Sequence, residues 1–76
     1  MKNICAENEL STMAKHWREK AGKSKAEVAR ELDVSEPSVF NAEERPDMSL
    51  AKLRIRMIES YSPYKVVGPV YVFEKK

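Results

Sequence analysis

Residues 24–43 constrain the fold of this chain most, because their sequence marks the ends of two short helices. Ser24 and Glu27 have the spacing of a capping box, in which each side chain accepts a hydrogen bond from the other residue's backbone N–H at the start of a helix. Ser35 can cap a second helix, and Pro37 fits its first turn, where a missing N–H costs nothing. The segment therefore predicts a helix, a tight turn and another helix.

The residues between these ends indicate that the two helices cross closely. The first helix is expected to end at Leu32 and the second to begin at Glu36, so that three residues form the turn. Ala29 lies at the expected crossing, where a larger side chain would push the helices apart, while Val34 and Val39 help to fill the small core. Such a pair is either a helix-turn-helix unit, whose second helix enters a DNA major groove about 12 Å wide, or a plain helical hairpin. The pattern alone leaves both readings open.

A helix is also expected before this segment. Met13, Trp17 and Ala21 recur at intervals of four residues and predict the apolar stripe of an amphipathic helix. Its start is expected at Ser11, whose hydroxyl can accept an orphan backbone N–H, or at the threonine after it, and Gly22 is expected to stop it. The residues before this helix show no clear period and are expected to be flexible.

The character of the chain changes after a fourth helix, expected over residues 50–61, whose apolar stripe is wide enough to touch two neighbours. Residues 64–67 and 70–73 are rich in β-branched and aromatic side chains and are separated by a glycine and a proline. These two runs predict either a β-hairpin or one kinked strand.

An isolated two-stranded ribbon is marginal in water, and an apolar one exposed at a sheet edge invites pairing. Residues 63–76 are therefore expected to pair with the same segment of a second subunit and to form a homodimer. The expected dimer interface consists of Tyr64, Val66, Val67, Val70, Val72 and Phe73.

Composition limits the chain to one small domain. With 76 residues it has room for a single core, and its net charge of +2 does not by itself indicate nucleic acid. The distribution of charge is more informative, because residues 31–44 include five acids and no lysine or arginine. The expected division is a flexible N-terminus (residues 1–10), a helical domain (residues 11–62) and a C-terminal β dimerisation segment (residues 63–76).

The single cysteine, Cys5, cannot form an internal disulfide. It is interpreted as a bystander thiol in a reducing compartment, with metal or redox chemistry as the alternative. No apolar run approaches the roughly 20 residues of a membrane span. The first residues also lack the hydrophobic stretch of a signal peptide. We therefore expect a cytoplasmic protein that has no membrane partner.

Catalysis is not expected of this sequence. Its one histidine, His16, falls on the polar side of the first helix, with no nearby cysteine or aspartate at a spacing that would activate a nucleophile. Two glycines cannot make a glycine-rich phosphate loop, and no cluster has the spacing of metal ligands. The expectation is a protein that is not an enzyme and uses no metal or cofactor.

Residues 25–43 (KAEVARELDVSEPSVFNAE) resemble the helix-turn-helix of the Cro/CI-type (XRE) family. Residues 44–54 (ERPDMSLAKLR), with the Ile-Glu pair at 58–59, are similar to the branch of that family found in toxin–antitoxin operons. The resemblance covers about residues 12–73. It implies a mainly α, lambda-repressor-like helix-turn-helix domain of four or five helices, followed by a C-terminal β-strand or hairpin.

The resemblance also implies roles for individual residues. Arg18 and Glu43 match a structural ion pair that joins the first helix to the third, and Lys25 matches a contact to the DNA backbone. The implied base contacts are Asn41 with adenine, Glu36 with the cytosine amino group and Phe40 with a thymine methyl group. The full expected DNA-binding set is Lys23, Ser24, Lys25, Ser35, Glu36, Pro37, Ser38, Phe40, Asn41 and Arg45.

Three departures from the family pattern matter. Asp33 stands in the turn where the family usually has glycine, although aspartate enters the left-handed region more easily than most residues. Glu36 and Pro37 replace the common glutamine or arginine base readers. The third helix has no basic residue, so affinity for phosphates is expected to come from its flanks, namely Lys23, Lys25, Arg45 and, further away, Lys52.

The resulting hypothesis is a sequence-specific transcriptional regulator, a repressor that binds a palindromic operator in double-stranded DNA as a homodimer. One alternative is an antitoxin that neutralises a toxin protein and represses its own operon, which the similarity of residues 44–54 favours. A further alternative is a protein-interaction module without DNA binding, which the acidic third helix favours.

Overall fold

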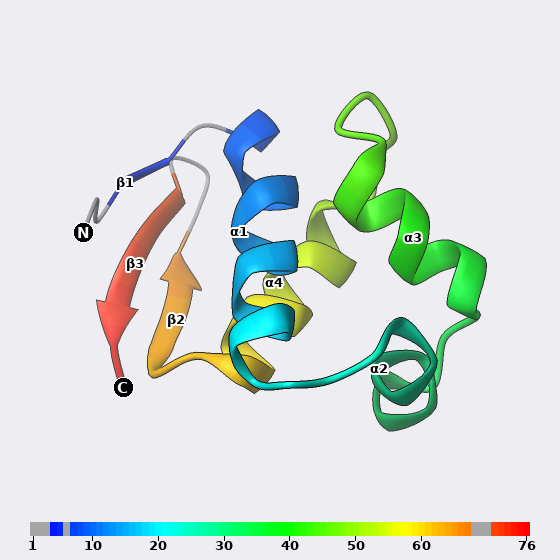
Figure 1. Ribbon diagram of the computed structural model, residues 1–76. Coiled ribbons are helices and arrows are strands. Elements are labelled where there is room, and N and C mark those ends of the chain that lie inside the picture. The colour runs from blue at the N-terminus through cyan, green and yellow to red at the C-terminus, as the bar shows by residue number, and fades with distance from the viewer. Residues whose placement is uncertain (1–3, 6, 68–70) are drawn as a thin grey trace.

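The computed structural model describes residues 4–5, 7–67 and 71–76, and in them the chain forms four helices and three strands (Figure 1). The helices are α1 (Glu7–Lys20), α2 (Lys25–Leu32), α3 (Glu36–Glu44) and α4 (Ala51–Tyr61), and the strands are β1 (Ile4–Cys5), β2 (Tyr64–Val67) and β3 (Tyr71–Lys75). In Figure 1 the sheet lies on one side of α1 and α4, and α2 and α3 lie on the other. The expected mainly α fold with a C-terminal hairpin is confirmed. None of the described helices is both long and apolar enough to cross a lipid bilayer.

The caps that the sequence predicts for α2 and α3 are present. At the start of α2, the Glu27 N–H donates to Ser24 Oγ at 3.1 Å and the Ser24 N–H donates to Glu27 Oε1 at 2.9 Å. These bonds from Ser24 hold the pKa of the Glu27 carboxyl below its usual value. At the start of α3, the Ser38 N–H donates to Ser35 Oγ at 3.2 Å. Local chemistry therefore sets where both helices begin.

The expected start of the first helix is wrong by one turn, because α1 begins at Glu7 and not at Ser11. The buried stripe of α1 runs through Leu10, Ala14 and Trp17, so Ser11 lies inside the packed helix at 2% exposure. Met13 is only half-buried, and Ala21 is exposed. The expectation of a flexible segment 1–10 is corrected for residues 4–5 and 7–10, which form β1 and the first turn of α1.

A single core joins the helices to the sheet. Trp17 of α1 lies beside Tyr64 of β2, with ring centroids 6.0 Å apart, and Tyr64 lies 6.1 Å from the ring of Phe73 in β3. The buried apolar residues are Leu10, Ala14, Trp17, Val28, Ala29, Leu32, Val39, Ala42, Leu53, Met57, Ile58 and Phe73.

The C-terminal runs form an antiparallel hairpin and not one kinked strand, since β2 pairs with β3 and Val66 lies opposite Phe73. The expected turn at Gly68-Pro69 lies outside the described residues, as does Val70 of the expected interface. The strand order is β1-β3-β2, because β1 pairs with the other edge of β3. The hairpin is therefore extended to a three-stranded sheet by β1, a strand from the N-terminal region of the same chain.

The apolar face of the hairpin is covered within the same chain. Phe73 is only 4% exposed, and Tyr64 and Val66 pack against the core. The place of Phe73 in the expected dimer interface is therefore corrected, because its side chain belongs to the core of its own chain. Alternation along the strands puts Val67, which is 39% exposed, and Val72 on the opposite face.

The free edge of β2 is also partly covered. In an antiparallel pair, successive residues of an edge strand turn their backbone groups alternately inward and outward. The Val66 N–H donates to Glu59 Oε2 at 2.9 Å, and the Tyr64 N–H donates to Ser62 Oγ at 3.1 Å. These side chains occupy donors that a strand from another chain would need, which disfavours pairing of two chains through β2.

Candidate nucleic-acid interface

The pair α2 and α3 has the helix-turn-helix geometry that the sequence predicts. α2 ends at Leu32 and α3 begins at Glu36, as expected. Asp33 closes α2 in the left-handed conformation, with φ of 56° and ψ of 50°, which aspartate adopts more easily than most residues do. The Val34 N–H donates to Ala29 O at 2.9 Å, and Ala29 is buried between the helices. The turn thus holds α3 at a fixed angle to α2.

The expected ion pair between α1 and α3 is confirmed. Arg18 Nε lies 2.5 Å from Glu43 Oε2, and Arg18 Nη2 lies 3.0 Å from Glu43 Oε1. The Glu43 side chain is fully buried. Arg18 also donates to Lys23 O at 2.8 Å, and its bond to Glu43 raises the pKa of the Arg18 guanidinium above its usual value. Glu43 therefore positions α3 and does not face outward.

Two arginines of α4 attach the other ends of the helix-turn-helix. Arg54 is fully buried and donates to Ala42 O at 2.9 Å and to Arg45 O at 2.7 Å. Arg56 donates to Leu32 O at 2.7 Å. These carbonyls lie at the C-terminal ends of α3 and α2, where helical partners are missing and a cation is favoured.

These roles of Arg54 and Arg56 are not among the expectations from the sequence, which assign no function to either arginine. The signal was present in the spacing. Arg54 lies three and four residues before Met57 and Ile58, which puts it on the apolar stripe of the helix. A charged residue on such a stripe indicates a buried partner and not a solvated surface.

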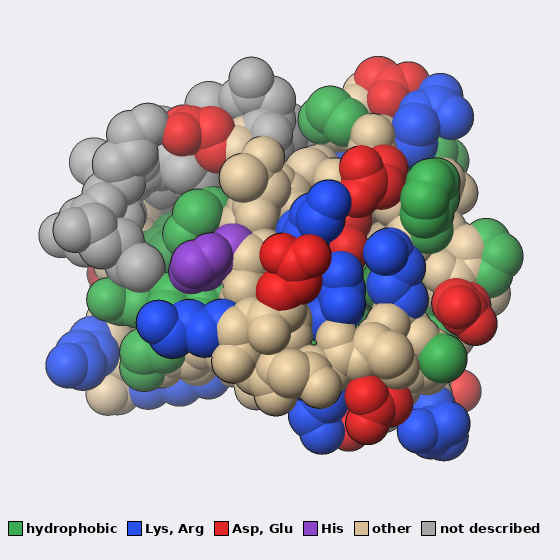
Figure 2. Space-filling model, in the orientation of Figure 1, with side chains coloured by type: hydrophobic (Ala, Val, Ile, Leu, Met, Phe, Trp, Pro, Cys, Tyr) green, Lys and Arg blue, Asp and Glu red, His purple; other side chains and the backbone are tan. Residues whose placement is uncertain are grey.

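The outer face of α3 brings together several of the expected base readers. Glu36, Pro37 and Phe40 are exposed there, and Asn41 is half-buried. Ser35 and Ser38, by contrast, bond to each other through their hydroxyls at 2.7 Å. Figure 2 shows hydrophobic side chains among acidic and basic ones over this part of the molecule. This candidate surface is thus partly apolar and carries few hydrogen-bonding groups.

Two of the expected phosphate-binding cations, Lys23 before α2 and Arg45 at the end of α3, have acidic neighbours. Lys23 Nζ lies 2.9 Å from Glu31 Oε2, and Arg45 Nη2 lies 3.1 Å from Asp47 Oδ2. Hydrogen bonds in these pairs raise the pKa of Lys23 and of Arg45 and lower that of Asp47. Such exposed pairs are weak and exchange partners at little cost. They nevertheless reduce the net charge that this face offers to phosphates.

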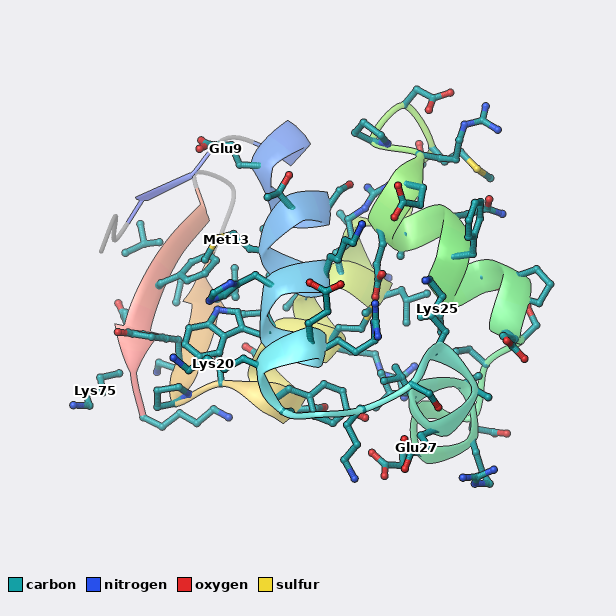
Figure 3. The ribbon with its side chains drawn as sticks, viewed as in Figure 1. Glu9, Met13, Lys20, Lys25, Glu27 and Lys75 are labelled. Carbon is teal, nitrogen blue, oxygen red and sulfur yellow. The ribbon has the colours of Figure 1, made fainter. Side chains whose placement is uncertain are left out.

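Lys25 is placed differently from these cations. Its side chain extends from α2 toward α3, as Figure 3 shows. Its ammonium lies 5.9 Å from the centroid of the Phe40 ring and 4.0 Å from Glu43 Oε1, whose charge is already neutralised by Arg18. Lys25 and the N-terminal end of α2 therefore form the most favourable place for a phosphate oxygen next to α3.

The described residues contain no group of three or more histidine, cysteine, aspartate or glutamate side chains arranged to hold a metal ion. His16 is exposed and lies edge-to-face against Trp17, with ring centroids 5.1 Å apart. Comparisons of the chain with protein-family models, with curated proteins and with solved structures find no match. Any function must therefore be argued from the geometry of the helix-turn-helix itself.

Proposed function

We propose that this chain is a sequence-specific DNA-binding regulator of transcription, of the Cro/CI type, in which α3 enters the major groove. The observation that carries the proposal is the way in which α3 is held. Arg18 fixes its Glu43 from α1, Arg54 fixes its C-terminal carbonyls from α4, and the turn at Asp33 fixes its start. The face left open, with Glu36, Phe40 and Asn41, is the face that a recognition helix turns toward base edges.

The proposed contacts divide into two kinds. Asn41 and Glu36 offer hydrogen bonds to base edges, and Phe40 offers an apolar contact. Lys25 and the start of α2 contact phosphates, which sets the position of the protein without reading sequence. Because Lys23 and Arg45 are engaged with acids, binding to random DNA is expected to be weak, and the specific contacts carry an unusually large share of the affinity.

The experiment that tests the proposal is selection of bound sequences from random double-stranded DNA, run at two stated salt concentrations, followed by titration of the selected site. The expected result is an enriched site whose affinity falls as salt rises. The absence of any enriched sequence and of any salt-sensitive binding would overturn the proposal.

Replacing Lys25 with alanine is expected to weaken binding to the selected site and to random DNA by a similar factor. It should also lower the slope of log affinity against log salt by about one for each Lys25–phosphate contact. Fluorescence anisotropy over a series of salt concentrations measures both quantities. Lys75→Ala is the matched control, because it removes the same charge from β3, on the far side of the molecule from α3 (Figure 3). An equal loss in both variants would contradict a specific role for Lys25.

The regulator is further proposed to act as a homodimer on a palindromic site, with two α3 helices about 34 Å apart. The part of the expected interface that lies on the outward face of the sheet is Val67 and Val72. Deleting residues 64–76 does not test this idea, because it would also remove Phe73 from the core.

A single substitution on the outward face provides a cleaner test of the dimer. Val67→Glu is expected to shift the protein toward monomer in sedimentation equilibrium, because a carboxylate would enter an apolar contact. Met48→Glu is the matched control, since Met48 is similarly exposed and lies between α3 and α4. Wild-type protein that remains monomeric with and without the selected DNA would contradict the dimer.

A second candidate function is binding of a partner protein through the same face of α3. The exposed apolar side chain of Phe40 favours it, as do the acids that neutralise the neighbouring cations. The DNA selection described above separates the two candidates, because a pure protein-interaction module would enrich no sequence.

A further inference from the structure

A hollow of about 420 Å³ lies on the outer side of the helix-turn-helix, lined by Lys25, Glu36, Pro37 and Phe40. Phe40 is 49% exposed, the largest value among the exposed large hydrophobic side chains of the described residues. The hollow therefore combines apolar surface from Phe40 and Pro37 with one cation from α2 and one carboxylate from α3. Beside the Lys25 ammonium, 5.9 Å from the ring centroid, the half-exposed Phe40 ring keeps apolar surface that another apolar group can cover with a gain in free energy.

The neighbours of the hollow along α3 indicate what kind of group enters it. Asn41 follows Phe40 directly and carries an amide that can bond to an adenine edge. The hydroxyls of Ser35 and Ser38 are bonded to each other at 2.7 Å and are thus less available to bases. Next to Asn41, this part of the recognition face is therefore better suited to an apolar group than to a hydrogen-bonding one.

Among the groups that unmodified base pairs present in the major groove, the apolar one is the 5-methyl group of thymine. We propose that the hollow beside Phe40 receives the 5-methyl group of one thymine in each half-site, so that recognition of the operator depends on that methyl group. The inference rests on the proposed DNA-binding function. Lys25 at the edge of the hollow is placed to contact the neighbouring phosphate, and the Glu36 carboxylate keeps phosphate oxygens out of the hollow itself.

The test replaces each thymine of the selected operator, one position at a time, with deoxyuridine, which lacks only the methyl group. At one position in each half-site, wild-type affinity is expected to fall about fourfold, the equivalent of about 0.8 kcal/mol for one buried methyl group. An operator with 5-methylcytosine at that same position is expected to bind more tightly than one with cytosine there. The methyl group of 5-methylcytosine projects into the major groove from C5, as that of thymine does.

The variant Phe40→Ala connects the effect to the hollow. It is expected to bind the thymine and deoxyuridine operators equally well. Met48→Ala, which removes another exposed apolar side chain, is the control and is expected to keep the wild-type ratio of affinities for these two operators. Circular dichroism of both variants checks that they are folded. If Phe40→Ala fails to fold, the wild-type comparison of thymine, deoxyuridine and 5-methylcytosine still decides the methyl dependence.

The outcomes separate this inference from the function on which it rests. Tight, salt-sensitive binding of a selected operator that is unaffected by deoxyuridine at every position would overturn the thymine inference alone. If the ratio of affinities for the thymine and deoxyuridine operators is the same in Phe40→Ala as in the wild type, the methyl group does not bind in the hollow beside Phe40. Failure to bind any DNA would overturn the proposed function, and binding of Phe40 to an apolar side chain of a partner protein would then explain its exposure.

Discussion

Replacing Arg18 with methionine is expected to lower the free energy of unfolding by about 3–5 kcal/mol, because it leaves the buried Glu43 carboxylate without its main partner. A domain of this size has a total stability on the order of 5–10 kcal/mol, so the variant should be close to unfolded at 37 °C. Urea titration followed by circular dichroism at low temperature measures the difference. A loss below about 1 kcal/mol would show that the pair does not hold α3 against α1.

The control for this prediction compares removal of one partner with removal of both. Arg18→Met combined with Glu43→Leu is expected to recover most of the lost stability, because replacing a whole buried pair by apolar side chains is often neutral or stabilising. Lys15→Met is the matched surface control. It breaks an exposed pair between the same two helices, Lys15 Nζ to Glu44 Oε2 at 3.0 Å, and is expected to change stability little.

Replacing Arg54 with methionine is expected to lower the free energy of unfolding by about 3–6 kcal/mol, since two hydrogen bonds from a charged donor are worth roughly 1.5–3 kcal/mol each. The substitution keeps an unbranched apolar stem but removes the guanidinium that donates to Ala42 O and Arg45 O at the end of α3. Thermal unfolding monitored by circular dichroism checks the loss.

Arg56→Met is the comparison for this second prediction. It removes one bond, to Leu32 O, from a side chain that is exposed, so its effect is expected to be clearly smaller. Arg54→Lys is expected to fall between the wild type and Arg54→Met, because one ammonium cannot span two carbonyls as a guanidinium does. Equal losses in Arg54→Met and Arg56→Met would contradict a special role for the buried guanidinium.

The parts of the fold that the sequence predicts well are those set by neighbouring residues. Ser24 and Glu27 lie in one helical turn, and so do Ser35 and Ser38, so their bonds form wherever a helix starts there. Asp33 likewise adopts its left-handed conformation within a three-residue turn. These local signals place α2 and α3 correctly before any tertiary contact is considered.

The parts that were missed depend on residues far apart in the chain. β1 is too short to have a pattern, and its pairing of Ile4 with Val72 joins opposite ends of the sequence. The hairpin was expected to need a second subunit because nothing local indicates that Phe73 would be buried in the core of its own chain. For the candidate site, the resemblance indicated the ion pair of Arg18, while the partners of Arg54 could be found only from the packed structure.

The pairing of β1 with β3 has a practical consequence for assembling this protein into larger molecules. Both strands lie across the molecule from α3 (Figure 1), so a tag or second domain attached to either end of the chain would leave the outer face of α3, the proposed DNA-binding surface, accessible. Two copies joined in tandem by a flexible peptide would then share a high effective concentration set by the length of that peptide. Such a single-chain tandem could engage both halves of a palindrome whether or not free copies associate.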